Sequence, residues 1–476
     1  MSAVTSPAFR DNARAALGDR QLQRALAEVP RGLAARRSAA RADLPEFEAL
    51  REAGRAIKDH TLAHLDLYLE AFEKKARAAG SQVHFAPTAE DARAIVRDIC
   101  RQAGARVVTK GKSMISEEIG LNQALEADGI EVVETDLGEY LIQIRGETPS
   151  HIIAPAIHLT QDQVEADFRR LHTGLPADRQ LAEPAQLVAE ARQVLRGRFL
   201  AADVGITGAN FMIAETGSTV IVTNEGNGDL TQSLPRVHVV LASIEKMVPT
   251  LEDVDTLIRL LARSATGQEI STYTTFSTGP RRAGDPDGPE ACHIVILDNG
   301  RSELLGGPFR EVLRCIRCGA CMNHCPVYGA IGGHAYGWVY PGPIGSVLTP
   351  ALIGVRQARH LPNASTFCGR CEEVCPMKIP LPGLMRHWRE AEFDARATPL
   401  LYRLGLAAWA AAARRPRLYH ALARLLMPAL GALGRRRGAF RRLPLLGGWT
   451  RHRDLAAPQG RTFQALWADT RAGVPR

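Results

Sequence analysis

The chain has 476 residues, of which 45% are hydrophobic and 23% are charged. This composition is ordinary for a globular protein, so it excludes a disordered or fibrous class, and the length predicts about three domains. The net charge of +8 is uneven, because residues 376–476 carry nineteen Lys or Arg and five Asp or Glu, which gives +14 there and −6 elsewhere. A basic tail on a mildly acidic body favours an acidic protein or a membrane surface as partner over nucleic acid. A solvated arginine-rich helical face is the alternative of equal weight.

The first two predicted regions are helical and then mixed. Residues 1–80 are alanine-rich with a helical pattern, so we expect an exposed N-terminal helical arm. In residues 81–300, short β-rich runs alternate with helical stretches, which predicts an α/β domain with a mainly parallel sheet. The expected strands are 83–85, 107–109, 131–134, 152–154, 211–214, 219–223, 237–242 and 293–297. The expected helices are 90–103 and 117–126.

The last two predicted regions are a cysteine-rich domain at 301–395 and a basic helical C-terminal region at 396–476. The longest uncharged apolar runs near the C-terminus, 404–413 and 425–434, have ten residues each. A membrane span needs about 20, so these runs predict core or interfacial helices. Basic residues and leucines are interleaved with tryptophans there, and we expect an amphipathic surface that docks an acidic partner subunit rather than lipid. The tryptophans of this expected surface are Trp388, Trp409, Trp449 and Trp467.

The first cysteine motif has the spacing Cys-x₂-Cys-x₂-Cys-x₃-Cys-Pro, at Cys315, Cys318, Cys321 and Cys325. Three thiolates at two-residue gaps can surround one iron–sulfur cluster, and the fourth cysteine of this pattern ligates a second cluster. Structural zinc is the alternative, but zinc ribbons use two separated cysteine pairs. The spacing therefore predicts two iron–sulfur clusters in a ferredoxin-type domain.

The second motif, FCGRCEEVCP, lacks the leading cysteine, and Ser365 stands in its place. Exchanging the fourth cysteines of the two motifs assigns four thiolates to cluster 1 and three to cluster 2. Cluster 1 takes Cys315, Cys318, Cys321 and Cys375, and cluster 2 takes Cys325, Cys368 and Cys371. The second cluster is then either 4Fe–4S with a non-cysteine fourth ligand or 3Fe–4S. Ser365 is a candidate ligand, although serine at such a position is more often a turn residue.

Two clusters in one small fold form a two-step electron relay. The sequence contains no Gly-x-Gly-x-x-Gly after a strand and no Cys-x-x-Cys-His for haem attachment. The thiolates require a reducing compartment, and the first twenty residues show neither an apolar signal core nor a twin-arginine pair. We therefore expect a cytoplasmic location, with peripheral attachment to the inner membrane as the alternative.

Polar residues follow several of the expected strands. Lys110 and Lys112 lie between a strand and a helix, where cations and backbone amides favour a carboxylate or phosphate. Glu215 precedes an apolar strand, and Asn224 and Glu225 follow it. Because ligands of α/β proteins bind at strand ends, we expect these five residues to line a pocket for a small carboxylate, with Glu215 as the candidate catalytic residue. Ordinary loop chemistry is the alternative for any one of them.

The sequence resembles the lactate utilisation protein B family in four segments, TKGKSMISEEIGLNQAL, GITGANFMIAETGSTVIVTNEGN, CIRCGACMNHCPVYG and CGRCEEVCPMKIPLPGL. The resemblance extends from about residue 40 past residue 400. It implies a LUD domain with a fold similar to CoA transferases, then a ferredoxin-type domain and a helical C-terminal region. It also implies oxidation of L-lactate to pyruvate with two partner subunits, a cysteine-rich iron–sulfur protein and a smaller LUD-domain protein. The family pattern likewise has seven cysteines, and a covalent CoA–glutamyl role for Glu215 is not implied.

We therefore expect the iron–sulfur electron-transfer subunit of a flavin-independent, lactate-oxidising complex. One alternative is a redox-sensing module, which would lose a cluster on oxidation and change a binding activity. Another is the same relay serving a different 2-hydroxy acid such as glycolate. One methyl group separates the two acids and contributes about 1–3 kcal/mol of pocket binding. The sequence leaves open which acid is used, and whether the carbon chemistry occurs in this chain or in a partner.

Overall fold

The computed structural model describes residues 4–111, 113–434, 436–442 and 453–472. The chain divides into two compact units, Met1–Asp394 and Ala395–Arg476. The α/β region and the cysteine region both belong to the first unit, so the expected boundaries at 80 and 300 lie inside it. The expected start of the C-terminal region, residue 396, lies beside the division between the units.

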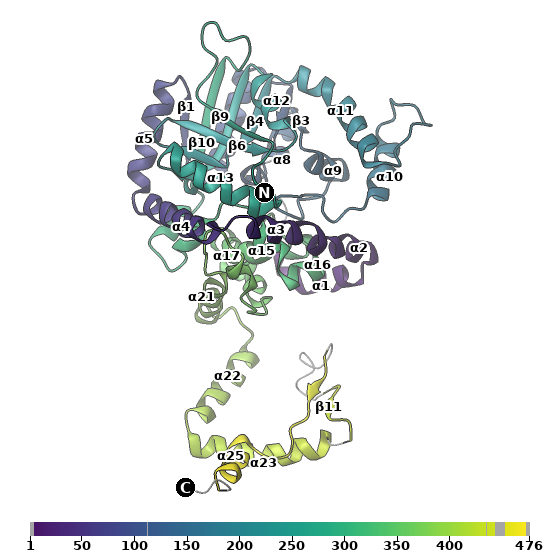
Figure 1. Ribbon diagram of the computed structural model, residues 1–476, viewed down its shortest axis with the longest axis vertical. Helices are drawn as coiled ribbons and strands as arrows, with labels where there is room; N and C mark the ends of the chain where they lie inside the picture. Colours follow the sequence, from purple (N-terminus) through teal and green to yellow (C-terminus); the bar gives the residue numbers. More distant parts are fainter. Residues whose placement is uncertain (1–3, 112, 435, 443–452, 473–476) are drawn as a thin grey trace. The chain divides into compact units, whose positions relative to one another are not determined.

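The centre of the first unit is a six-stranded sheet in the order β1-β10-β7-β4-β2-β3, with every neighbouring pair parallel (Figure 1). Its strands are β1 (Gln82–Ala86), β2 (Val107–Lys110), β3 (Glu131–Glu134), β4 (Val204–Gly208), β7 (Val237–Ser243) and β10 (Ala291–Leu297). The strand order reverses between β2 and β4, because β2 continues to β3 at one edge and β4 continues to β7 on the other side. Such a reversal opens a crevice at the carboxyl ends of the strands, where α/β proteins bind ligands.

Both faces of this sheet are covered, which explains why its central strands are nearly continuous apolar runs. Val239 and Leu241 of β7 pack on one face with the helices that follow β1 and β2. Val240 and Ala242, which point the opposite way, pack with Phe72 of the N-terminal region. The helices of this α/β part are α6 (Ala89–Gln102), α7 (Met114–Ile119), α8 (Leu121–Ala127), α9 (Leu137–Arg145), α10 (Gln161–Leu171), α11 (Pro184–Ala201), α12 (Asn227–Ser233), α13 (Leu251–Ala265) and α14 (Arg301–Leu305).

A smaller sheet joins the α/β part to the cysteine region. Its order is β8-β5-β6-β9, with β5–β6 and β6–β9 antiparallel and β5–β8 parallel. Phe211, Val220 and Val248 of this sheet share one hydrophobic core with the cysteine motifs. The short turn η3 (Ile244–Lys246) leads from β7 into this sheet. Its strands are β5 (Phe211–Ile213), β6 (Ser218–Thr223), β8 (Met247–Val248) and β9 (Tyr273–Ser277).

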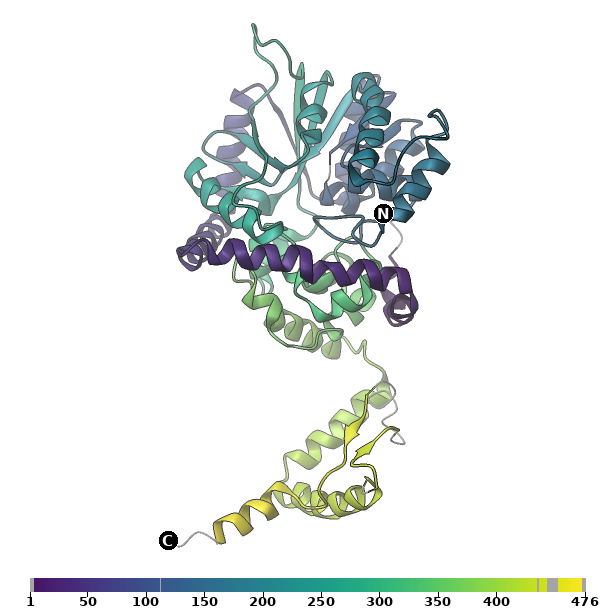
Figure 2. The ribbon, with the colours of Figure 1, turned by 45° about the vertical axis from the view of Figure 1, so that its right-hand side comes forward.

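The N-terminal region is helical, but the expectation of an exposed arm is wrong. The helices of residues 35–63 run between the α/β part and the cysteine helices (Figure 2), whereas the helix of residues 65–78 packs against β1. Arg37 donates a 2.7 Å hydrogen bond to the carbonyl of Val374, and Arg51 donates one of 2.7 Å to the carbonyl of Cys375. Its charged side chains therefore fix the second cysteine motif as well as facing solvent. The helices are α1 (Phe9–Gly18), α2 (Arg20–Val29), α3 (Ala35–Ala42), α4 (Phe47–Ala63) and α5 (Leu65–Ala78).

Three elements differ from what the sequence predicts. Residues 152–154 form a loop, because the His151 ring accepts the backbone N–H groups of Ile153 and Ala154 that a strand would have paired. The expected helix 117–126 is broken at Gly120, whose left-handed backbone ends α7 and starts α8. The strand β4 is not among the expected strands, and it contains Gly205, where a side chain would collide with the Thr231 carbonyl.

The cysteine region consists of short helices joined by the two motif loops. Its helices are η4 (Arg310–Arg314), α15 (Ala320–Asn323), α16 (Pro326–Ile331), α17 (Gly342–Ile353), α18 (Val355–Ala358), α19 (His360–Asn363), α20 (Arg370–Glu373) and α21 (Leu381–Asp394). Trp388 lies in α21, where its indole donates to the Val347 carbonyl at 2.9 Å and stacks on Phe309. Trp388 is therefore part of the first unit, and its assignment to a C-terminal docking surface is corrected.

The C-terminal unit contains two long helices with exposed apolar side chains. No residue of α22 is buried, and Leu401, Trp409, Leu425 and Leu433 are among the most exposed apolar residues of the described chain. Trp449 lies outside the described residues. No helix in the described ranges combines the length and the apolar character needed to cross a membrane. The elements are α22 (Leu400–Ala413), α23 (Pro416–Gly434), β11 (Ala439–Phe440), β12 (Leu455–Ala456) and α25 (Phe463–Ala472).

Candidate functional site

Four cysteines from both motifs line one cavity, here called the inner cysteine site. The first motif contributes three cysteines and the second contributes one. The rest of the lining is mainly apolar and includes Ile152, Ile344 and Leu381. The four cysteines are Cys315, Cys318, Cys321 and Cys375.

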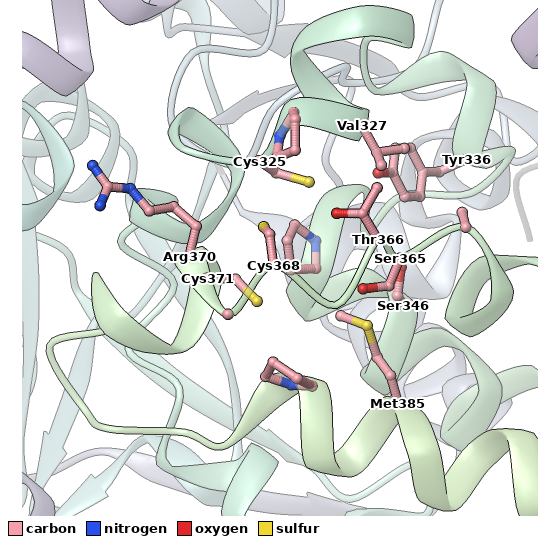
Figure 3. A pocket seen from close by; sticks show the side chains of 15 residues that line it. Cys325, Val327, Tyr336, Ser346, Ser365, Thr366, Cys368, Arg370, Cys371 and Met385 are labelled. Carbon is pink, nitrogen blue, oxygen red and sulfur yellow. The ribbon is translucent and has the colours of Figure 1, made fainter. Parts of the chain in front are cut away.

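The other three cysteines line a second cavity, here called the outer cysteine site. Figure 3 shows these three cysteines and the loop that carries Ser365 and Thr366 around the same space. Cys368 is exposed, whereas none of the four cysteines of the inner site is exposed. The three cysteines are Cys325, Cys368 and Cys371.

The two motif loops repeat the same local geometry. The N–H of Arg317 donates to the Cys315 sulfur at 3.4 Å, and the N–H of Phe367 donates to the Ser365 hydroxyl oxygen at 3.1 Å. Arg317 and Phe367 both have positive φ, at 61° and 53°, and a short helix follows each loop. Ser365 therefore occupies in the outer loop the place that Cys315 occupies in the inner loop.

The thiols of both sites suit a metal centre. Burial raises the pKa of Cys318 and of Cys371 to about 12 and that of Cys375 to about 11. Such thiols stay neutral unless a metal stabilises the thiolate. The backbone N–H of Tyr328 points at the Cys325 sulfur, as amides around iron–sulfur clusters do. The donor set, the burial and these N–H···S contacts fit iron–sulfur clusters at both sites.

A buried network of charges lies between the inner site and the α/β part. Glu245 accepts a hydrogen bond from Arg317 at 3.1 Å and is paired with Arg301 at 3.0 Å. Arg301 binds Glu118 through two hydrogen bonds of 2.9 and 2.6 Å, and the Tyr340 hydroxyl donates to Glu118 at 2.7 Å. Burial opposes the charge of Glu245, but Arg301 and Arg317 outweigh it and lower its pKa to about 2.

This network contains more cations than carboxylates in the part of the chain that the structure describes. Lys58 is buried and donates to the backbone carbonyl of Glu245 rather than to a carboxylate. Lys246 is buried without a hydrogen bond or ion pair to any described residue, and burial and the nearby Arg317 lower its pKa to about 8. One Arg317 nitrogen, Nη1, also lacks a described partner. The region next to Cys315 is therefore electropositive.

A cavity of about 230 Å³ lies where the strand order reverses. The segments that follow β2 and β4, the end of β6 and the start of α12 form its walls. Lys246 and Arg317 also line it, so the electropositive network opens into this space. It is here called the acid cavity. Its volume lies below the roughly 300–1,000 Å³ typical of pockets for drug-sized ligands, which suits a small molecule.

Two of the predicted pocket residues line the acid cavity, namely Asn224 and Glu225. Gly111 and Ser113, on either side of Lys112, also line it, but Lys112 itself is outside the described residues. The Asn224 side chain holds the loop after β6 in place, because it accepts the backbone N–H of Thr272 at 3.2 Å.

The structure does not bring Lys110 or Glu215 to the acid cavity. The Lys110 ammonium is buried and bonds Glu117 and Glu134, each at 2.7 Å. Burial opposes its charge, but these carboxylates outweigh burial and raise its pKa. Glu215 is exposed at the other end of β6, where its carboxylate accepts the Leu251 N–H at 3.1 Å. Both residues thus have structural partners, and the predicted pocket is corrected on this point.

Sequence reasoning missed Lys246 and Arg317. Both have a recognisable signal: Lys246 follows a buried strand of the parallel sheet, and Arg317 stands between two cluster cysteines. That the two meet at one cavity follows only from the packing of the cysteine loop against the α/β part.

Comparisons with known protein families match three parts of the chain. A LUD domain matches residues 69–297, a 4Fe-4S dicluster domain matches 311–379, and the C-terminal domain of lactate utilisation protein B matches 392–472. Lactate utilization protein B of Bacillus licheniformis is 42% identical over 97% of this chain and 97% of its own length. The protein of that name from Shouchella clausii is 41% identical over 97% of this chain and 96% of its own. A crystal structure of a DUF162 family protein from Deinococcus radiodurans is 15% identical, covers 49% of this chain and 98% of its own, and superposes with a TM-score of 0.28.

Proposed function

This chain belongs to the lactate utilisation protein B family, and from that premise we propose that it is the iron–sulfur electron-transfer subunit of a flavin-independent complex that oxidises L-lactate to pyruvate. The observation that carries the proposal is the pair of cysteine sites. Each site is lined by cysteines of both motifs, and Ser365 also lines the outer one. Helices α15 and α20, which follow the two motif loops, pack against each other, so the sites are neighbours.

The reaction sets the requirement for two sites. Oxidation of L-lactate to pyruvate releases two electrons and two protons, as the C–H and O–H bonds of the carbinol carbon break and a carbonyl forms. A bound iron–sulfur cluster accepts and releases one electron at a time, so two clusters match the two electrons. The role of the protein is to hold the clusters close together, shield them from water and set the charge around them.

In this proposal the inner site holds a 4Fe–4S cluster through four cysteine thiolates. The outer site holds its cluster through three thiolates, either as 3Fe–4S or as 4Fe–4S with Ser365 at the fourth corner. The repeated loop geometry supports the second form, because the Ser365 oxygen takes the place of the Cys315 sulfur. The cluster 1 ligands are Cys315, Cys318, Cys321 and Cys375, and the cluster 2 ligands are Cys325, Cys368 and Cys371.

The partners are part of the same proposal. They are a cysteine-rich iron–sulfur protein and a smaller LUD-domain protein. The net charge of +14 on residues 376–476 and the exposed apolar face of α22 suit an acidic partner subunit. A CoA-transferase-like arrangement of the LUD domain also belongs to the proposal and is supported by the six-stranded parallel sheet.

Anaerobic co-purification of the chain with its partners, followed by an assay with L-lactate and an artificial one-electron acceptor, tests this function. We expect pyruvate formation, reversible reduction of both clusters, and loss of the reaction in a chain that carries Cys318→Ser and Cys371→Ser together. Faster turnover with glycolate than with L-lactate would identify glycolate as the substrate. Loss of a cluster on oxidation, together with a changed binding activity and no 2-hydroxy acid oxidation, would replace the proposal with a redox sensor.

A further inference from the structure

Two buried cations line the acid cavity with donor groups that no described residue accepts, although Glu245 accepts a hydrogen bond from the other terminal nitrogen of Arg317. The side chains of Lys246 and Arg317 are more than nine-tenths buried and line the cavity. Lys246 has no hydrogen bond or ion pair within the described residues, and Arg317 Nη1 has no described acceptor. A buried donor without an acceptor is costly, and a buried charge is more so. Two such groups facing one cavity indicate an anionic ligand.

The acid cavity is also lined by neutral polar groups without a described partner. The Thr223 hydroxyl and the Asn227 carbonyl oxygen are buried, line the cavity and have no described hydrogen-bond partner. Two carboxylates, Asp136 and Glu225, also line it, and Asp136 accepts the N–H of Gly138 at the start of α9. The anion therefore belongs beside Lys246 and Arg317, and a donor such as a hydroxyl suits Thr223 and Asn227.

We propose that the acid cavity binds a small 2-hydroxy acid, with its carboxylate on Lys246 and Arg317 and its hydroxyl on Thr223 and Asn227. Apolar side chains, among them Ile152, Val222 and Leu241, also line the cavity and suit a short alkyl group. The volume of about 230 Å³ fits a three-carbon acid.

The acid cavity also adjoins the inner cysteine site. Arg317 belongs to both, because its side chain lines the cavity and its backbone N–H donates to the Cys315 sulfur at 3.4 Å. A carboxylate on Arg317 thus places the carbinol carbon on the side of the α/β part that faces the inner site. This inference rests on the proposed function for the identity of the acid, and it assigns substrate binding to this chain rather than to a partner.

Calorimetric titration of the full-length, anaerobically reconstituted chain without partners or acceptor tests the carboxylate contacts. L-Lactate is the probe. Loss of a charge-assisted hydrogen bond predicts that Lys246→Gln weakens L-lactate binding roughly 10- to 100-fold. Lys74→Gln, at an exposed lysine of α5, is the matched control and leaves the affinity unchanged. Equal affinities of the wild type and Lys246→Gln, with equal iron contents, would overturn the proposal.

The hydroxyl contact is tested by a second variant and a second ligand. Thr223→Val keeps the shape of the side chain and removes its hydroxyl, so it should weaken L-lactate binding roughly 2- to 10-fold and leave propionate binding unchanged. Wild-type chain should bind L-lactate more tightly than propionate. Equal binding of the two acids by the wild type would refute the assigned orientation.

The two proposals fail in different ways. No L-lactate binding to this chain, in a complex that still oxidises lactate through reducible clusters, would refute the acid cavity and leave the relay in place. Binding that depends on Lys246, in a complex whose clusters L-lactate never reduces, would refute the relay and leave the cavity as a binding site.

Discussion

The inner and outer cysteine sites share one loop design and differ in what surrounds them. The inner site has four cysteines, lies beside the Glu245 charge network and adjoins the acid cavity. The outer site has three cysteines and Ser365, and Cys368 is exposed. The same loop thus makes a shielded site next to the acid cavity and a site within reach of the surface. In the proposed relay electrons enter at the inner site and leave at the outer site.

Removal of one ligand from each site should have the largest effect. Cys318→Ser and Cys375→Ser should remove the same EPR signal, that of the inner cluster, although the two residues lie in different motifs. Cys325→Ser and Cys371→Ser should remove the other signal. Each variant should lose about half of the seven or eight irons expected for the two clusters. Loss of one common signal in Cys325→Ser and Cys375→Ser would show that the ligands are not exchanged between the motifs.

The Glu245 charge network lies beside the inner site, and breaking it should have the next largest effect, on the free energy of unfolding. Glu245→Gln leaves Arg317 buried without its carboxylate, so the free energy of unfolding should fall by about 3–5 kcal/mol. Glu290→Gln removes the exposed ion pair with Arg281 and should change the free energy of unfolding by less than about 1 kcal/mol. Chemical denaturation of the anaerobic protein measures both. Equal small changes would mean that the network contributes little.

Ser365→Cys should make the outer site resemble the inner one. A thiolate at the position equivalent to Cys315 should give a 4Fe–4S cluster with four cysteine ligands, so the outer EPR signal changes while the inner signal stays. Iron rises by about one per chain if the natural outer cluster is 3Fe–4S. An unchanged outer spectrum would place residue 365 away from the cluster.

A smaller effect should distinguish the electrostatics of the two sites. Arg37 is buried, its charge interacts with Cys318 and Cys375 of the inner site, and it bonds the Val374 carbonyl. Removing this positive charge in Arg37→Gln destabilises the reduced, more negative cluster. The reduction potential of the inner cluster should therefore fall by a few tens of millivolts, which corresponds to on the order of 1 kcal/mol for one electron. The potential of the outer cluster should not change. Potentiometric EPR titration measures both, and equal shifts at the two sites would contradict the assigned surroundings.

The C-terminal unit should matter least to the clusters. A chain truncated after Pro399 should keep its full iron content, because residues from Ala395 onward form a separate compact unit. Its association with the partner subunits should weaken, and the association of the full-length chain should weaken as salt rises, since charges are screened over about 8–10 Å at physiological ionic strength. Unchanged assembly of the truncated chain at low and high salt would make the tail a solvated basic cap. Salt-dependent loss of liposome binding instead would make lipid the partner.

Local patterns allowed much of the fold to be predicted. The expected strands at 83–85, 107–109, 131–134 and 237–242 lie within β1, β2, β3 and β7, because buried parallel strands are continuous apolar runs. The run at 152–154 has the same composition but forms a loop, since His151 takes its backbone N–H groups. A contact of this kind depends on tertiary placement and leaves no periodic signal.

The candidate site was predictable only in part for the same reason. Cysteine spacing is a local constraint, and it led to the two groups of cysteines that line separate cavities. Lys110 and Glu215 stood at strand ends as expected, but their partners, Glu134 and the Leu251 N–H, come from other elements. Lys246 and Arg317 lie 71 positions apart and meet only because the cysteine loop packs against the small sheet.

Reduction of both clusters by substrate is the most direct test of the central claim. The anaerobic complex is mixed with L-lactate in the absence of an acceptor and frozen for EPR, with Cys318→Ser and Cys371→Ser complexes as references for the two signals. We expect the spectra of both the inner and the outer cluster to change to those of their reduced forms, together with pyruvate formation. Pyruvate formation with both spectra unchanged would contradict the account, because the electrons of lactate would then bypass this chain.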